Sequence, residues 1–234
     1  MNLLAFDTST EAMSVALQRA GAAPLERRGE GGARASSTLI PTVMELLAQA
    51  GIGLAALDAI AFGCGPGSFT GLRTACSVAQ GLALGAGVPV LPVETLMAVA
   101  EDARGRCGAT DVLAVLDARM DEVYAARHRF DGVRWQREGE IRLCAPDALQ
   151  ATAPCLAGNA FGPYGDRLPA AAAQVEALPT AAALLRLAPA LLAQGLGRPA
   201  EQALPLYVRD KVAQTSAERE ASRAQAGARA RMTP

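Results

Sequence analysis

The chain has 234 residues, 51% of them hydrophobic, and a formal net charge of −1. This length and apolar content suit one large domain or two small lobes and exclude wholesale disorder. An independent nucleic-acid binder usually has a basic surplus, which this chain lacks, and its single histidine excludes any metal motif that needs a histidine pair.

The cysteines and the apolar segments point to a cytoplasmic protein. The five cysteines are odd in number and show no metal-binding spacing, so we expect buried thiols in a reducing cytosol. The N-terminus lacks the pattern of a signal peptide, and no apolar run reaches the length of a membrane span.

The first third of the chain alternates strand and helix signals. Short apolar runs bounded by glycines predict strands at residues 3–7, 13–17 and 23–28. Ser36, Ser37 and Thr38 suggest a cap for a helix over residues 39–50, with Pro41 in its first turn. A strand, a helix, a strand and a helix follow at residues 59–63, 70–84, 88–93 and 94–103.

An internal sequence repeat predicts that the second half of the chain is a smaller copy of the first. Residues 3–7 (Leu-Leu-Ala-Phe-Asp) are matched by residues 113–117 (Leu-Ala-Val-Leu-Asp), and two further strands follow, at 122–130 and 133–143. A helix, a strand and a helix then follow at residues 145–151, 154–158 and 181–194. We therefore expect an N-terminal lobe, a reduced C-terminal lobe, a segment packing back on the core and a disordered tail, over residues 1–104, 105–194, 195–215 and 216–234.

Asp7, Thr8, Ser9 and Thr10 follow the first strand, and Asp117 occupies the equivalent place in the second half. Two such turns facing each other across a cleft are typical of a nucleotide site, where the acids hold hydrated magnesium. Neither turn contains the glycine that lets a backbone approach phosphates closely. The sequence predicts a degenerate nucleotide site, and the simpler alternative is that Asp7 and Thr8 only cap a turn.

Residues 63–73, Gly-Cys-Gly-Pro-Gly-Ser-Phe-Thr-Gly-Leu-Arg, form the most specific string. They predict a tight loop after a strand, with Ser68 or Thr70 capping the next helix. The spacing fits neither a Walker loop nor a dinucleotide fingerprint. A hydrolase that pairs Ser68 with His128 is a further alternative, although the string is not a nucleophile elbow.

The two helices beside this loop carry surplus apolar or small surface. In residues 39–50 the polar side chains form one narrow stripe, and the next helix repeats small residues at every fourth position. Because one sheet covers only one helix face, we expect both helices to meet another protein. The residues that we assign to this partner surface are Leu39, Ile40, Val43, Met44, Leu47, Ser68, Phe69, Arg73, Ala75 and Ala79.

With these motifs placed, the chain resembles the TsaB (YeaZ) family over about residues 1–212. The resembling strings lie at residues 4–11, 65–73, 79–85, 116–124 and 205–209. The resemblance implies an α/β, actin-like ATPase (ASKHA) fold of two related lobes with mixed sheets, the second reduced. It also implies that the helices at 39–50 and 70–84 build a dimer interface.

The resemblance further implies a non-catalytic subunit of the machinery that makes threonylcarbamoyladenosine (t6A) at adenosine 37 of tRNA. Such a subunit forms a heterodimer with the catalytic paralogue TsaD, assembles with the ATPase TsaE and meets tRNA indirectly. It needs no metal or cofactor of its own, although ATP or ADP can bind at the heterodimer interface, and it can form a homodimer in isolation. The alternative within this fold is a small-metabolite kinase that uses Asp7 and Asp117.

Overall fold

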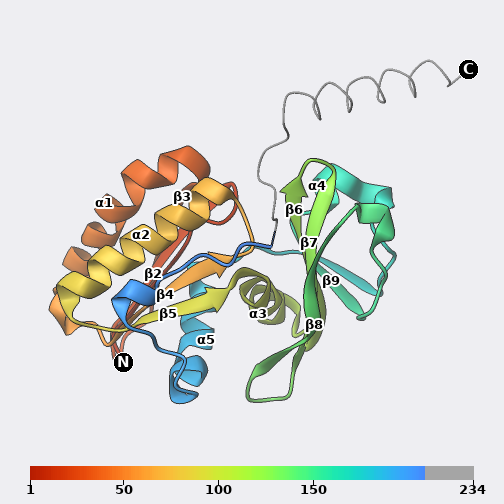
Figure 1. Cartoon of the computed structure of the whole chain (residues 1–234). Coiled ribbons are helices and arrows are strands. Elements are labelled where there is room, and N and C mark those ends of the chain that lie inside the picture. Colours follow the sequence, from red (N-terminus) through yellow and green to blue (C-terminus); the bar gives the residue numbers. More distant parts are fainter. Residues whose placement is uncertain (209–234) are drawn as a thin grey trace, which may run out of the picture.

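Two five-stranded sheets with the same strand order organise the chain, of which the computed structural model describes residues 1–208 (Figure 1). The strands of the first sheet are β1 (Leu3–Asp7), β2 (Ala12–Gln18), β3 (Leu25–Glu30), β4 (Ala59–Gly65) and β5 (Val90–Glu94). Their order is β3-β2-β1-β4-β5, with β1 antiparallel to β2 and parallel to β4.

The second sheet repeats this topology. Its strands are β6 (Asp111–Arg119), β7 (Glu122–Phe130), β8 (Trp135–Cys144), β9 (Cys155–Gly158) and β10 (Ala173–Glu176). Read from β8, the order is β8-β7-β6-β9-β10, again with the first strand antiparallel to the second and parallel to the fourth. The shared order confirms the duplication that the echo in the sequence predicted.

The second lobe is reduced in its helices. The α-helices are α1 (Ala35–Ala50), α2 (Phe69–Ala86), α3 (Thr95–Cys107), α4 (Phe161–Tyr164) and α5 (Ala181–Ala193). Where the first lobe has α1 and α2, the second has only the 3-10 turns η3 (Pro146–Ala148) and η4 (Gly165–Arg167) and the four-residue α4. The helix predicted at residues 145–151 is therefore wrong, and β10 and α4 had no clear signal in the sequence.

The long helices and the sheets form alternating layers. Helices α1 and α2 cover one face of the first sheet, and α5 packs on its other face (Figure 1). Helix α3 lies between the two sheets, where it contacts β4, β5, β6, β7 and β9. Each lobe's last helix thus packs against the other lobe, so a single apolar core joins the two sheets through α3 and α5.

Helix α1 begins four residues earlier than predicted. It starts at Ala35, directly after the 3-10 turn η1 (Gly32–Arg34), so the predicted cap residues lie inside the helix. The hydroxyls of Ser37 and Thr38 donate to the Arg34 carbonyl oxygen at 2.9 and 3.0 Å. Pro41 consequently lies in the helix interior rather than in its first turn.

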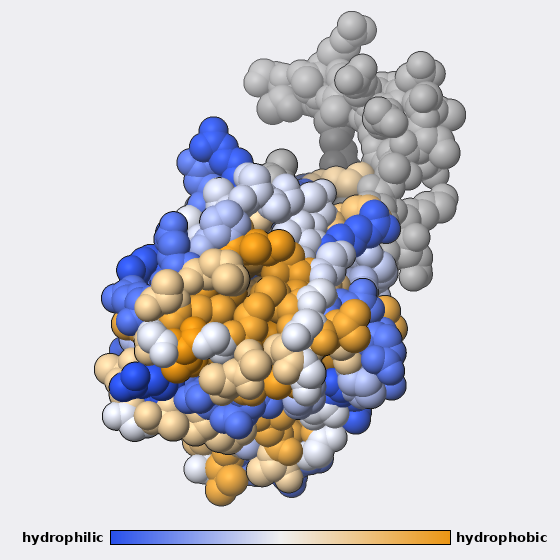
Figure 2. Space-filling view, turned by 90° about the vertical axis from the view of Figure 1, so that its left-hand side faces the viewer, coloured by the Kyte–Doolittle hydropathy of each residue, from blue (hydrophilic) through white to orange (hydrophobic). Residues whose placement is uncertain are grey.

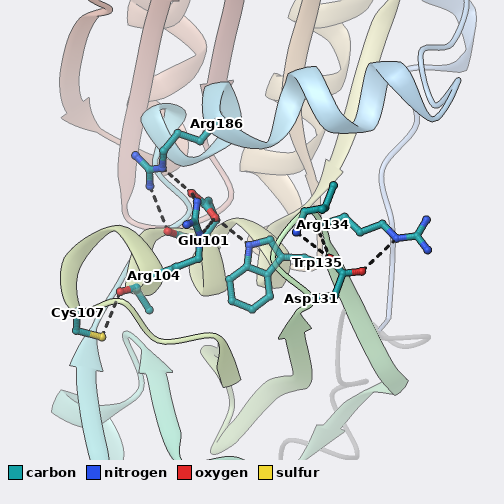
Figure 3. Close-up of polar contacts among 9 residues, drawn as sticks. Glu101, Arg104, Cys107, Asp131, Arg134, Trp135 and Arg186 are labelled. Atoms are coloured by element: carbon teal, nitrogen blue, oxygen red, sulfur yellow. Dashed lines mark hydrogen bonds and ion pairs between the residues drawn. The ribbon is translucent and has the colours of Figure 1, made fainter.

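A buried carboxylate ties α3 to both lobes. Glu101 on α3 accepts hydrogen bonds from Trp135 Nε1 on β8 at 2.9 Å, from Arg186 Nε on α5 at 2.6 Å and from Arg104 Nε at 2.8 Å (Figure 3). Burial opposes ionisation of Glu101, but these hydrogen bonds outweigh it and hold the pKa of the carboxyl below its usual range.

Residues 195–208, the described part of the segment predicted at residues 195–215, return to the first lobe. Arg198 bridges Val90 at the open edge of β5, and the Leu206 N–H donates to the Cys64 carbonyl oxygen at 2.7 Å. The remainder of that segment and the predicted disordered tail lie outside the described residues. In residues 1–208, no helix combines the length and apolar character required to cross a bilayer.

Candidate functional site

A cleft of about 520 Å³ lies between the two lobes. Its floor is formed where the turn after β1, the Gly-Pro-Gly loop after β4 and the turn after β6 approach one another. Of the predicted nucleotide residues, Ser9, Thr10 and Asp117 line the cleft, and so do Ser68 and Phe69 of the loop. The structure therefore brings both predicted turns to one site.

Asp7 lies behind this cleft rather than in it. Its side chain is buried, and its Oδ1 accepts hydrogen bonds from the Ser9 N–H at 2.8 Å and the Ser9 Oγ at 2.7 Å. Its Oδ2 has no partner and abuts Gly63, where a β-carbon would lie 1.7 Å from that oxygen. Burial raises the pKa of Asp7 to about 7 against the hydrogen bonds from Ser9. Asp7 thus holds the first turn through its two hydrogen bonds with Ser9.

The glycines of the loop allow it to pack on that same turn. A β-carbon on Gly67 would lie 2.6 Å from the Ser9 carbonyl oxygen, and one on Gly71 would lie 1.8 Å from the Thr8 carbonyl oxygen. The Thr8 hydroxyl donates to the Gly71 carbonyl oxygen at 2.7 Å. The most specific string in the sequence therefore fixes the start of α2 against the end of β1.

Ser68 and His128 do not form a catalytic pair. Ser68 is the N-cap of α2, where its Oγ accepts from the Gly71 N–H at 3.5 Å. His128 is fully buried on β7, and its Nε2 lies 2.9 Å from Glu94 Oε1. A buried imidazole that pairs with Glu94 is not available to a serine on the cleft wall, so the hydrolase alternative has no geometry to support it.

Asp117, at the second turn, already has several partners. Its Oδ1 accepts from the Tyr164 hydroxyl at 2.8 Å and from the Arg119 N–H at 2.7 Å, and its Oδ2 pairs with the Arg119 guanidinium at 3.1 Å. Asn159 Oδ1 accepts from the Asp117 N–H at 2.9 Å. Asn159 was not among the predicted site residues, and neither was Tyr164, which lies in the short helix α4.

The charged side chains that line the cleft are mostly acidic. The charged side chains that line it are Glu11, Glu30, Asp117 and Arg119, so acids outnumber bases, and Arg119 is paired with Asp117. Among residues 1–208, no group of three or more His, Cys, Asp or Glu side chains is arranged to hold a metal ion. A phosphate group in the cleft would thus meet like charges and a first turn without glycine, although Gly31, Gly32 and Gly67 also line the cleft.

The structure divides the predicted partner surface into a buried part and an exposed part. At the start of α2, Ser68 and Arg73 are exposed and Phe69 is half-buried, and Ser68 and Phe69 line the cleft. The residues that instead belong to the core beneath the helices are Leu39, Val43, Leu47, Ala75 and Ala79. The small-residue stripe of α2 thus faces its own sheet, because a narrow helix face lets that sheet approach closely.

The exposed side of α1 and α2 nevertheless remains apolar. Ile40 and Met44 are 47% and 49% exposed on α1, and Leu84 is 75% exposed on α2. Gly81 and Gly85 are exposed on α2, and a β-carbon at either position would meet nothing within 4 Å. Figure 2 shows a continuous apolar area on this side, framed by hydrophilic side chains. We call Ile40, Met44, Gly81, Leu84 and Gly85 the α1–α2 face.

An aromatic and guanidinium stack marks the end of α2 nearest the cleft. Phe69 and Tyr207 stack with ring centroids 5.5 Å apart, and the Arg73 guanidinium lies 3.4 Å from the Phe69 centroid. Arg73 Nε also donates to the Tyr207 hydroxyl at 3.0 Å. The sequence predicted Phe69 and Arg73 as partner residues, but Tyr207 is more than a hundred positions away and gave no sign of joining them.

Comparison with known proteins identifies this architecture. The family model described as TsaD, tRNA N6-adenosine threonylcarbamoyltransferase, matches residues 31–159. The tRNA threonylcarbamoyladenosine biosynthesis protein TsaB of Escherichia coli is 36% identical over 91% of this chain and 96% of its own length. The protein of the same name from Haemophilus influenzae is also 36% identical, over 91% of this chain and 95% of its own length.

A solved structure agrees with these relatives. YeaZ from Pseudomonas aeruginosa superposes with a TM-score of 0.82 at 41% identity, and the match covers 88% of this chain and 99% of that one. The repeated sheets and the interlobe cleft are those of the actin-like ASKHA fold to which TsaD and YeaZ proteins belong. The chain therefore belongs to the TsaB (YeaZ) family, whose curated relatives take part in the biosynthesis of threonylcarbamoyladenosine in tRNA.

Proposed function

We propose that this chain is a non-catalytic subunit that supports t6A formation by forming a heterodimer with a TsaD-like catalytic paralogue. The observation that carries the proposal is the α1–α2 face, an exposed apolar surface on two long helices. Ile40 and Met44 supply apolar area, and Gly81 and Gly85 leave room for a partner helix to approach. A paralogue of the same fold presents equivalent helices, so two such faces can form a helical bundle.

The cleft supports the non-catalytic part of the proposal. Its first acid, Asp7, is buried behind the turn, and its second, Asp117, is held by Tyr164 and Arg119. A kinase of this fold would need both carboxylates to reach hydrated magnesium beside the phosphates. We infer that ATP or ADP binds, where it binds at all, at the heterodimer interface, and that a TsaE-like ATPase and tRNA join the assembled complex.

Two variants of α1 that each add one negative charge test the interface. Met44→Glu places a charge in the α1–α2 face, whereas Gln49→Glu places one on the polar side of α1, where Gln49 already accepts from Arg27 at 2.7 Å. We expect both proteins to fold, and only Met44→Glu to lose the paralogue in size-exclusion chromatography of the mixed pair. Normal binding by Met44→Glu, or a homodimer of this chain that persists when the paralogue is added, would refute the assignment.

A further inference from the structure

A second pocket, of about 80 Å³, opens where α3, the hairpin of β7 and β8, and α5 meet. We call it the α3–α5 pocket. It lies on the side of the first sheet that α5 covers, opposite the helices of the α1–α2 face, so both surfaces can be occupied at once (Figure 1). The apolar side chains that line it include Met97, Phe130, Val133, Leu187, Leu191 and Trp135, which is the single tryptophan of the chain.

The charged side chains of this pocket leave a positive surplus. Arg104 and Arg186 converge on the carboxylate of Glu101, with Arg104 Nη2 at 3.0 Å and Arg186 Nε at 2.6 Å from Oε1 (Figure 3). Two guanidinium groups thus share one carboxylate, whereas Arg134 at the rim pairs with Asp131 at 3.5 Å. The Glu101 side chain is buried, but those of Arg104 and Arg186 are 34% and 41% exposed, so the unbalanced charge faces solvent.

The two guanidinium groups are held in place by the protein itself. Arg186 Nη2 donates to the Glu101 main-chain carbonyl oxygen at 3.2 Å and lies over Gly105, where a β-carbon would stand 2.9 Å from that nitrogen. The Arg104 guanidinium lies 4.5 Å from the centroid of the Phe130 ring. Because both side chains are already ordered, an incoming anion would immobilise little further side-chain freedom when it binds them.

The rim of the pocket presents an apolar side chain to solvent. Asp131 Oδ1 accepts hydrogen bonds from the Val133 and Arg134 N–H groups at 2.9 and 2.8 Å, which fixes the tip of the hairpin. In this position the Val133 side chain is 78% exposed. An exposed apolar side chain beside an apolar pocket is typical of a surface that meets another protein.

Size and charge together decide the class of ligand. Pockets for cofactors and nucleotides measure roughly 300–1,000 Å³, so a pocket of about 80 Å³ has room for one side chain but not for such a molecule. Counting Glu101 and Asp131 against the three arginines leaves a surplus of one positive charge. That surplus suits a carboxylate, whereas nucleic acid gains most of its affinity from the neutralisation of many phosphates.

We propose that the α3–α5 pocket docks an acidic segment of a partner protein, which inserts one apolar side chain against Trp135 and places a carboxylate on Arg104 and Arg186. A planar guanidinium can donate two parallel hydrogen bonds to a carboxylate, which fixes the orientation of the segment. Arg134 at the rim meets a second carboxylate of the same segment. The inference rests on this pocket alone and stands whether or not the α1–α2 face binds the paralogue.

The fluorescence of Trp135 tests the proposal in the full-length chain, because no other tryptophan contributes to the signal. The probe is an acetylated and amidated pentapeptide, Asp-Glu-Leu-Glu-Asp. Two control peptides remove one property each: Asn-Gln-Leu-Gln-Asn lacks the charges, and Asp-Glu-Ser-Glu-Asp lacks the apolar side chain. We expect a saturable change in emission with the probe and about tenfold weaker binding of each control. No saturable change at millimolar probe, or equal binding of the three peptides, would overturn the proposal.

Two variants of α5 place the binding in the pocket. Ala190→Leu fills the pocket, whereas Ala193→Leu makes the same change on the same helix outside the lining. Ala190→Leu should lose the response to the probe, and Ala193→Leu should keep it. Should Ala190→Leu fail to fold, Arg134→Gln at the exposed rim serves instead, because it should weaken the acidic probe several-fold and leave the neutral control unchanged.

Two results of these titrations would contradict the assignment. Unchanged binding of the probe by both Ala190→Leu and Arg134→Gln would show that the peptide does not enter the α3–α5 pocket. Displacement of the probe by an oligouridylate at a lower concentration than the probe itself requires would show that the pocket binds RNA and not an acidic protein segment.

Discussion

The ionisation of Asp7 tests how the first turn is built. One carboxylate oxygen accepts two hydrogen bonds from Ser9, and the other has no partner beside Gly63. Burial raises the pKa from 3.8 to about 7. Because one pKa unit corresponds to about 1.4 kcal/mol, this change corresponds to about 4 kcal/mol of unfolding free energy.

The direction in which pH changes the stability follows from the protonation of Asp7 in the folded and in the unfolded chain. Below pH 3.8 the Asp7 carboxyl is protonated in the folded and in the unfolded chain, so ionisation contributes nothing. Between pH 3.8 and about 7 the unfolded chain loses this proton while the folded chain keeps it, which favours unfolding. The stability of the wild-type protein should therefore fall relative to Asp7→Asn as the pH rises, by about 4 kcal/mol in total.

Urea denaturation between pH 4 and pH 8 measures this difference. The comparison uses the wild-type protein, Asp7→Asn, and Asp166→Asn, which makes the same chemical change at an exposed site. Stability of the wild-type protein that rises with pH relative to Asp7→Asn, or that shows no pH-dependent difference from it, would mean that Asp7 is ionised in the folded state. That result would refute the buried role assigned to Asp7 and would revive a cation at the first turn.

Three further variants probe the loop, the lobe junction and the interface. Gly71→Ala should lower the unfolding free energy by about 3 kcal/mol in urea, because its β-carbon would strike the Thr8 carbonyl, whereas Gly81→Ala on the same helix should raise it by about 1 kcal/mol. Glu101→Gln should lower the unfolding free energy by about 2–4 kcal/mol at pH 7. Denaturation curves at pH 7 and below pH 4.5 should show that this difference shrinks at the lower pH, because the carboxyl of the wild-type protein becomes protonated there. Gly81→Leu should leave the monomer at least as stable yet weaken binding of the paralogue roughly tenfold in titration calorimetry, because a large side chain blocks close approach of a helix; an unchanged affinity would remove Gly81 from the interface.

The sequence was sufficient for the framework of the fold. Strand β1 is predicted with the observed bounds because its run is apolar, short and ended by an acid, and the echo at residues 113–117 indicates the second sheet. The bounds of α1 were missed because Ser37 and Thr38 can bond inside a helix as well as cap one. Strand β10 was missed because it has four residues, of which only Val175 is partly buried and apolar.

The site was only partly predictable, because burial is decided by tertiary packing. The apolar pattern of α1 could not separate Val43, which packs beneath the helix, from Met44, which faces outward. The small residues at every fourth position of α2 do allow close packing, but against a different neighbour from the one predicted. Ala75 and Ala79 pack on the sheet of their own lobe rather than on a partner protein. No sequence signal connects Tyr207 to Phe69, because only the fold brings these two rings together.

The most direct test of the central claim compares one variant of the α1–α2 face with one variant of the cleft. A reconstituted reaction with the TsaD-like paralogue, the TsaE-like ATPase and unmodified tRNA would be run with the wild-type chain, with Met44→Glu and with Asp117→Asn. The proposal predicts that t6A formation requires this chain, falls strongly with Met44→Glu and stays close to the wild-type rate with Asp117→Asn. Full activity of Met44→Glu together with loss of activity in Asp117→Asn would contradict it and would place the function in the cleft.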